Sequence, residues 1–339
     1  MLTRRKFLNQ CAFIGTATVC STLQAKPLSF LLDRNEHKAL NSKDRFKLTK
    51  AILDFLETHY KGMTLSFWSE PFENIDFEKR ITNILHWVDL AIQEHQSIYP
   101  VDPLWVMSQI MAESLFCELA ISPSLAAGIC QFMPSTAVNP YQMTIAGSLP
   151  SHRKPPYVAT DLANSLNDYR NLVKQRGQYQ RDSRKDARYN LDDALQLLAE
   201  GKSAKAEAKA QLARNEKIKE MNMGIELARD NYISYIETNV ATLGKNDIFG
   251  HSKFFIGFDE RLTYRKPIFS MVHMLANALR VRNGNILTAA AAYNAGLKRT
   301  WTNETIYTNY GMLPGIEETA RYVSRIVANY EEIALRYYA

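Results

Sequence analysis

The stretch from residue 106 to residue 137, "VMSQIMAESLFCELAISPSLAAGICQFMPSTA", carries two glutamates in its first half and no acid after them. The next acidic residue after Glu118 is Asp161. Just before this stretch, Asp102 and Pro103 form a good helix start, with aspartate as the N-cap and proline at the first helical position. We therefore expect a helix that runs to about Cys117 or Glu118 and presents Glu113 as an isolated acid.

On such a helix, the neighbours of Glu113 are the residues three and four positions away, Gln109, Ile110, Phe116 and Cys117. All of them except Gln109 are apolar. Burial against apolar neighbours disfavours the charged form of a carboxyl group and raises its pKa. Such a group holds a proton near neutral pH and is able to give it to a leaving oxygen. Glu118 is expected to be solvated, and the alternative for Glu113 itself is a surface residue in a salt bridge.

The remaining chain is predicted to be helical almost throughout. Apolar residues recur at helical spacing in several segments: 44–60, 76–98, 267–282, 286–295 and 317–337. Alternating strand patterns are scarce, and at most a short hairpin near 251–264 is expected. The fold class is therefore all-α, with residues 26–100 forming an N-terminal helical segment.

Between residues 138 and 262 the composition changes. A proline-rich connector, "PSHRKPPY" (150–157), precedes a charged stretch over 161–240 in which Leu, Ile and Tyr recur at helical intervals. This pattern indicates two or three long solvated helices with a break near Gly201. We interpret 138–262 as a helical insertion that lies over or beside the functional cleft, or that docks a protein partner of the cell envelope.

The first residues have the layout of an export signal. "MLTRRKFLNQCAFIGTATVCSTLQAKP" has a basic head, an apolar middle too short for a membrane helix, and Ala25 before a change of character. The pair Arg4 and Arg5 is typical of a twin-arginine signal, and a general secretory signal is the alternative. We expect cleavage after residue 25, no membrane span in the mature chain, and a periplasmic location. Lipid attachment at Cys20 is a less favoured alternative.

Two cysteines, Cys117 and Cys130, remain after the signal, and the sequence leaves open whether they pair or stay buried thiols. The motifs CxxC and HExxH do not occur and the seven histidines are scattered, so no metal site and no cofactor are expected. The net charge of +6 suits an anionic partner. Nucleic acid is disfavoured, because the chain is predicted to be exported and its basic residues are interleaved with acids.

Three segments in order resemble the soluble lytic transglycosylases of the lysozyme-like superfamily. The first is "ESLF" (113–116), followed by Ser122 and "AAGICQFMPSTA" (126–137). The second is "AAAAYNAG" (289–296), and the third is "LPGIEETARYVSRIVANY" (313–330). The resemblance covers about a third of the chain and implies a lysozyme-like α domain formed by 101–137 and 263–339.

The resemblance implies cleavage of the MurNAc-GlcNAc β-1,4 bond in the glycan strands of peptidoglycan. Glu113 would act first as acid and then as base, while the 6-hydroxyl of the muramic acid attacks and gives a 1,6-anhydro product. Tyr293 would hold the carboxyl group in orientation. The residues implied to contact substrate or to line the cleft are Ser122, Gln131, Met133, Asn294, Glu318 and Tyr322. The alternatives are a turn cap for Ser122, a buried amide for Gln131, core packing for Met133 and a first-turn helix acid for Glu318.

Two departures from the family pattern are visible: Leu125 stands where glycine is usual, and Cys130 replaces a methionine. Both residues are expected beside the substrate groove, so they affect how individual sugar units bind and leave the proton chemistry of Glu113 unchanged. The runner-up functions are a lysozyme-type muramidase that hydrolyses the same bond and a catalytically minor scaffold of an envelope secretion or conjugation machine.

Overall fold

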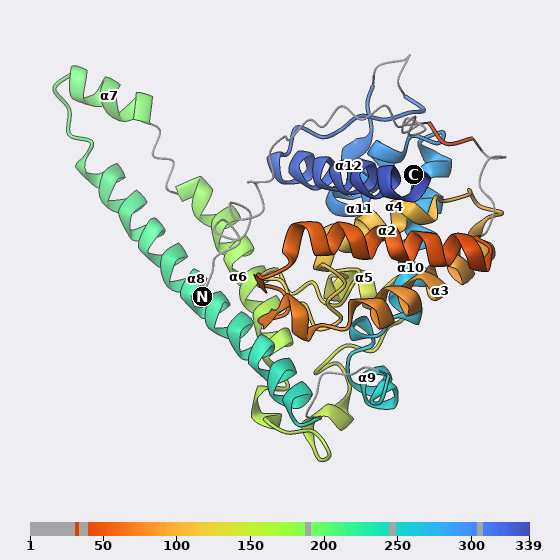
Figure 1. The fold of residues 1–339 in the computed structure, drawn as a ribbon. Helices are drawn as coiled ribbons and strands as arrows, with labels where there is room; N and C mark the ends of the chain where they lie inside the picture. Colours follow the sequence, from red (N-terminus) through yellow and green to blue (C-terminus); the bar gives the residue numbers. More distant parts are fainter. Residues whose placement is uncertain (1–30, 34–39, 187–190, 244–248, 304–307) are drawn as a thin grey trace. The chain divides into compact units, whose positions relative to one another are not determined.

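The computed structural model describes residues 31–33, 40–186, 191–243, 249–303 and 308–339, and it is mainly helical (Figure 1). The predicted signal segment 1–25, with Cys11 and Cys20, lies outside the described residues. Within the described residues, no helix combines the length and the apolar character that a membrane span requires. The all-α fold class is confirmed.

The chain divides into two compact units. Unit 1 comprises Met1–Thr144 and Ile248–Ala339, and unit 2 comprises Ile145–Asp247. The expected insertion, 138–262, is longer than unit 2 at both ends, and its role as an insertion into the domain stays a prediction.

Unit 1 contains the helices that surround the 106–137 segment. They are α2 (Ser42–Tyr60), α3 (Phe77–His95), α4 (Pro103–Ser114), α5 (Pro134–Val138), α9 (Ser252–Phe258), α10 (Arg265–Val281), α11 (Ile286–Ala295) and α12 (Glu317–Tyr338). Short 3-10 turns join them: η1 (Phe72–Asn74), η4 (Glu260–Leu262) and η5 (Leu297–Thr300). Helix α12 packs against both α4 and α2, and α10 packs against α3 and α11 (Figure 1).

Side chains of Asn and Asp begin four of these helices. Asn41, Asp76, Asp102 and Asn285 each accept a hydrogen bond from a backbone N–H in the first turn of the helix that follows. Such caps satisfy N–H groups that have no partner within the helix. The predicted start of α4 at Asp102 and Pro103 is therefore confirmed.

The predicted hairpin near 251–264 is wrong. This region forms α9 and η4, and the one two-stranded sheet of the described residues pairs β1 (Thr64–Leu65) with β2 (Glu70–Pro71). Phe255 and Phe258 lie three positions apart in α9 and are both buried. A short apolar run of this kind fits a helix or a strand equally well, because its length is too small for periodicity to decide.

Unit 2 is built mainly from α6 (Ser165–Asp186), α7 (Leu191–Ala199) and α8 (Lys205–Ala241), preceded by the turns η2 (Pro150–Arg153) and η3 (Thr160–Leu162). Helices α6 and α8 pack against each other. Gly201 has a φ of +68° in the connection between α7 and α8, so the predicted break at this glycine is confirmed. Buried residues occur only in the C-terminal half of α8, from Ile225 to Val240, as expected for a largely solvated helix.

Candidate functional site

Glu113 differs from the other residues of α4 in its exposure to solvent. Eleven of the twelve residues of this helix are buried, and Glu113 is the one that is not. It lies half-buried in the last turn. A helix that is apolar on all sides belongs in a protein core. Glu113 therefore combines an apolar setting with access to solvent, which is what a proton carrier needs.

Tyr322 of α12 fixes the Glu113 carboxyl group. Its phenol donates a hydrogen bond of 2.6 Å to Glu113 Oε1, from a position 209 residues further along the chain. The same two helices are joined by Arg325 Nη1, which donates to the Ala112 carbonyl at 3.0 Å, and by Asn329 Nδ2, which donates to the Ser108 carbonyl at 3.2 Å. The orientation of the Glu113 carboxyl group is thus set by a row of hydrogen bonds between α4 and α12.

Tyr293 takes a different partner from the one expected. Its phenol donates to the Cys130 carbonyl at 2.7 Å, so it joins α11 to the loop that carries Gln131. A carboxyl-orienting contact of the kind that the resemblance implies for Tyr293 is made by Tyr322, and an orienting role of Tyr293 stays a prediction. Both tyrosines belong to motifs singled out in the sequence, and the fold shows that Tyr322 donates a hydrogen bond to Glu113.

The charges of these groups act on one another. Burial, and then the nearby Glu113 carboxylate, raises the pKa of the Cys130 thiol. Burial also raises the pKa of Tyr293 and that of Tyr322, and the Glu113 carboxylate adds to both shifts. Glu113 is therefore the carboxylate that acts on all three groups, and both phenols remain proton donors over the physiological pH range.

Glu118, the second acid of the segment, is not solvated as expected. Only 1% of its surface is exposed, and Arg80 Nη2 lies 3.1 Å from its Oε1. The helix ends earlier than predicted, at Ser114, because Leu115 and Phe116 have φ values of 49° and 62°. The chain therefore turns before Glu118 and directs it to Arg80. A buried, ion-paired carboxylate is unsuited to exchanging protons with a substrate.

The loop from Ala120 to Phe132 is held together by its own polar side chains. The Ser122 hydroxyl accepts a hydrogen bond from the Ala126 N–H at 3.0 Å. Gln131 Nε2 donates to the carbonyls of Ala120 and Gly128, at 3.0 and 2.9 Å. These contacts correspond to the structural alternatives considered for the two residues, a turn cap and an internal amide.

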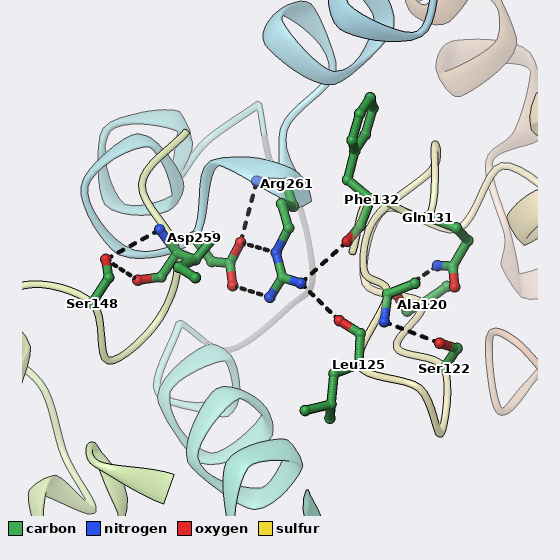
Figure 2. A network of polar contacts seen from close by, with 10 residues as sticks. Ala120, Ser122, Leu125, Gln131, Phe132, Ser148, Asp259 and Arg261 are labelled. Atoms are coloured by element: carbon green, nitrogen blue, oxygen red, sulfur yellow. Dashed lines mark hydrogen bonds and ion pairs between the residues drawn. The ribbon is translucent and has the colours of Figure 1, made fainter. Parts of the chain in front are cut away.

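A buried ion pair fixes this loop from the other side (Figure 2). Arg261 Nη2 lies 2.7 Å from Asp259 Oδ2, and both side chains are completely buried. Arg261 Nη1 donates to the carbonyls of Leu125 and Phe132, at 2.8 and 3.2 Å. At Gly128, a Cβ atom would lie 1.8 Å from the Arg261 carbonyl oxygen, so only glycine permits this approach. Arg261 therefore joins η4 to two points of the loop, Leu125 and Phe132.

The backbone of this region is strained at several positions. Leu115, Phe116, Leu125 and Gln131 all have positive φ values, between 48° and 69°. Non-glycine residues in the left-handed region cost of order 1–3 kcal/mol each and cluster at functional sites. Leu125, which replaces the glycine usual in the resembling family, has a φ of 69°, a conformation that glycine adopts without strain. Its side chain is 1% exposed, so burial offsets that strain.

The remaining predicted residues lie around this core with differing exposure. Met133 is 39% exposed at the start of α5. Asn294 is exposed on α11 and accepts a hydrogen bond from Thr319 Oγ1 at 2.7 Å. Glu318 is exposed in the first turn of α12, the position of its helix-acid alternative.

The sequence analysis assigned no role to three charged residues that hold the 106–137 segment from other parts of the chain, Asp259, Arg261 and Arg325. Asp259 and Arg261 lie in a segment interpreted as insertion, and Arg325 falls inside the third motif without a role. Nothing in the local sequence marks Arg261 as a buried arginine, because its burial depends on the loop folded over it. Arg325 was accessible to prediction, since it lies three residues after Tyr322 and hence on a neighbouring face of the same helix.

Cys117 and Cys130 are both buried free thiols, the second of the two alternatives left open. Cys117 Sγ lies 3.3 Å from the Phe67 carbonyl oxygen. Burial, with the nearby Glu118 carboxylate, raises the pKa of Cys117 from 9.0 to about 12.

This shift predicts a loss of stability at alkaline pH. Between pH 9 and pH 12, the unfolded chain releases the Cys117 proton while the folded protein keeps it, so the free energy of unfolding falls as pH rises, by up to about 1.4 kcal/mol per pH unit. Below pH 9 the Cys117 thiol does not change the free energy of unfolding with pH, because it is protonated in both the folded and the unfolded state. Urea unfolding followed at pH 8 to 11 should show a steeper decline for the wild type than for Cys117→Ser. Equal slopes would mean that the folded protein does not hold this proton.

Comparison with known proteins gives one match. Residues 90–203 match the protein family described as the transglycosylase SLT domain. The match contains α4, Glu113 and the 120–132 loop. Comparison with curated proteins and with solved structures gave no match. Among the described residues, no group of three or more His, Cys, Asp or Glu side chains is placed to hold a metal ion.

Proposed function

Because residues 90–203 match the transglycosylase SLT domain family, we propose that the protein cleaves the MurNAc-GlcNAc β-1,4 bond of peptidoglycan with formation of a 1,6-anhydro end. Peptidoglycan lytic transglycosylase activity is the general activity of this family. The specific proposal is that Glu113 alone carries the proton. The observation that supports it best is the 2.6 Å hydrogen bond from Tyr322, which brings two distant motifs together at one carboxyl group.

The proposed reaction has two steps. In the first, protonated Glu113 gives its proton to the glycosidic oxygen, and the bond between this oxygen and C1 of the muramic acid breaks. In the second, the 6-hydroxyl oxygen of the same sugar bonds to C1, and its proton passes to the Glu113 carboxylate. The carboxyl group is restored, no water is consumed, and the product carries a 1,6-anhydro ring. Tyr322 would hold the carboxyl group through both steps.

The electrostatics of the site favour a single-acid reaction. Most glycosidases need a second carboxylate as nucleophile or base. Glu118, the nearest acid in the sequence, is buried in an ion pair with Arg80. No Asp or Glu occurs from residue 119 to residue 160. The substrate's own hydroxyl is therefore the nucleophile we propose.

The loop and the flanking helices are proposed to bind the sugar units. Ser122 and Gln131 are part-buried and hydrogen-bond to the loop backbone. Met133 offers an exposed apolar contact, and Asn294 and Glu318 lie exposed on α11 and α12. An extracytoplasmic location is consistent with a peptidoglycan substrate. Export through a twin-arginine signal to the periplasm remains the proposal made from the sequence.

Product analysis tests this function. Peptidoglycan digested with the purified protein and analysed by mass spectrometry should contain anhydro-muramyl ends, which are 18 mass units lighter (roughly one water) than the reducing ends that hydrolysis gives. Reducing ends would identify a muramidase instead. An absence of both would favour the scaffold alternative.

Tyr322→Phe should lower activity without unfolding the protein. The substitution removes the donor to Glu113 Oε1 but keeps the ring in its packing, so we expect kcat to fall about 10-fold or more, as for the loss of one charge-assisted hydrogen bond. The matched control is Tyr330→Phe, on the same helix, which removes a 2.9 Å hydrogen bond to Asp102 at the other end of α4. The control should cost stability and leave kcat unchanged. Equal kcat values for the two variants would contradict the orienting role.

The charged helices are proposed to position the enzyme on the wall or to dock an envelope partner. This rests on the length of α8 and on the exposure of its N-terminal half. A chain in which residues 145–247 are replaced by a short linker should keep its product type but lose part of its wall localisation or partner binding. Unchanged activity, localisation and binding would remove this role.

A further inference from the structure

A cavity of about 590 Å³ lies in unit 1, between α3, α9, η4 and α10. None of the candidate site residues lines it. Its walls are mainly apolar and come from Trp87, Ile256 and Phe269, among others. Cavities of 300–1,000 Å³ with apolar walls and a few polar groups are the usual sites of small ligands. The proposed function assigns no role to this cavity.

Two of its charged residues neutralise each other. Lys266 Nζ lies 2.9 Å from Glu260 Oε2 and also donates to the Gln142 carbonyl at 2.8 Å. Glu260 accepts a further hydrogen bond from the Thr144 N–H at 3.2 Å. Both side chains line the cavity, and together they contribute no net charge.

Arg265 supplies the remaining charge. Its guanidinium group lies 5.8 Å from the Trp87 ring centroid and 5.9 Å from that of Phe269. Across the part of the chain that the structure describes, no carboxylate lies within ion-pair distance of it. Among the described residues that line the cavity, the net charge is therefore one positive charge, on a planar group supported by two aromatic rings. Such a guanidinium is suited to bidentate pairing with a carboxylate.

We infer that this cavity binds the terminal carboxylate of a short peptide whose last side chain is apolar. The carboxylate would pair with Arg265, and the apolar side chain would contact Trp87, Ile256 and Phe269. A phosphate is disfavoured, because its second charge would lie beside Glu260 and the described lining residues offer no second unpaired cation. A sugar is disfavoured, because the apolar walls would leave most of its hydroxyl groups without partners.

Two sources supply this chemistry. Peptidoglycan carries short peptides that end in D-amino acids, so one source is the proposed substrate itself, and to that extent the inference rests on the proposed function. The other source is the C-terminus of a protein, which consists of L-amino acids. The two differ in chirality at the residue that carries the carboxylate, and this difference separates them experimentally.

The test uses the full chain and four blocked dipeptides. N-acetyl-D-Ala-D-Ala and N-acetyl-L-Ala-L-Ala, each as the free acid and as the C-terminal amide, are titrated by calorimetry against wild type, Arg265→Gln and Arg280→Gln. Arg280 is an exposed arginine of the same helix that does not line the cavity. At least one of the two acids should bind the wild type saturably. The corresponding amide should bind the wild type about 10-fold or more weakly than the acid, and the acid should bind Arg265→Gln about 10-fold or more weakly than it binds the wild type. Arg280→Gln should bind as the wild type does.

Preference for the D-acid would point to wall peptides, and preference for the L-acid would point to a protein C-terminus. No saturable binding of either acid up to about 20 mM, or binding unaffected by Arg265→Gln, would overturn the inference. Both results are independent of glycan cleavage, because the dipeptides contain no sugar. If the protein formed no anhydro products but bound a dipeptide through Arg265, the proposed function would be contradicted and the inference about this cavity would stand.

Discussion

Glu113→Gln is expected to abolish peptidoglycan cleavage while the protein stays folded. Glutamine keeps the size of the side chain and keeps an oxygen that accepts the hydrogen bond from Tyr322. It has no proton to give to the glycosidic oxygen. General acid–base catalysis contributes roughly 10² to 10⁴-fold to a rate, so a loss of at least this size is expected in kcat.

The measurement is the rate of release of soluble fragments from purified peptidoglycan. Thermal unfolding serves as the control for folding, and the unfolding temperature of Glu113→Gln should stay close to that of the wild type. A second control is Glu318→Gln, at an exposed acid in the first turn of α12. It should reduce the rate by much less. A Glu113→Gln protein that still clears peptidoglycan would remove the single-acid mechanism.

Arg261→Met is expected to be the most destabilising single change of the two units. It would leave the Asp259 carboxylate buried without its partner and would leave the Leu125 and Phe132 carbonyls without their donor. Removing one member of a buried ion pair costs about 3–5 kcal/mol. We therefore expect a loss of this size in the free energy of unfolding of unit 1.

Tryptophan fluorescence during urea unfolding measures this loss selectively, because all four tryptophans, Trp68, Trp87, Trp105 and Trp301, belong to unit 1. The matched control is Arg321→Met, which breaks an exposed ion pair with Glu317 on the surface of α12. It should cost less than about 1 kcal/mol. The double variant Asp259→Leu/Arg261→Met should lose less than the sum of the single variants, because no unpaired charge stays buried. A single Arg261→Met within about 1 kcal/mol of the wild type would show that the pair does not hold the loop.

Much of the fold was predictable because it depends on local patterns. The helices over 42–60, 77–95, 265–281, 286–295 and 317–338 lie within a few residues of the predicted segments. The cap formed by Asp102 and Pro103 was readable from two residues, since capping involves only neighbours in the sequence. The short run around Phe255 was misread, because too few residues were available to separate a helix from a strand.

The candidate site was predictable only in part. The sequence singled out Glu113, Tyr293 and Tyr322 as members of three motifs. It could not determine that Tyr322 bonds Glu113 while Tyr293 bonds the Cys130 carbonyl, because both contacts join residues more than 150 positions apart. The expected solvation of Glu118 was wrong for a related reason. Its environment depends on the two left-handed residues that end α4 and on Arg80 from another helix.

The helical class, the start of helix α4 and the presence of an acid in the last turn of this helix were readable from the sequence, because these follow from the spacing and chemistry of residues a few positions apart. The hydrogen bond from Tyr322 to Glu113, the contacts of Arg261 with the loop and the position of Arg265 beside two aromatic rings became clear only from the fold. Burial and pairing of charges depend on which surfaces meet, and no local pattern records that.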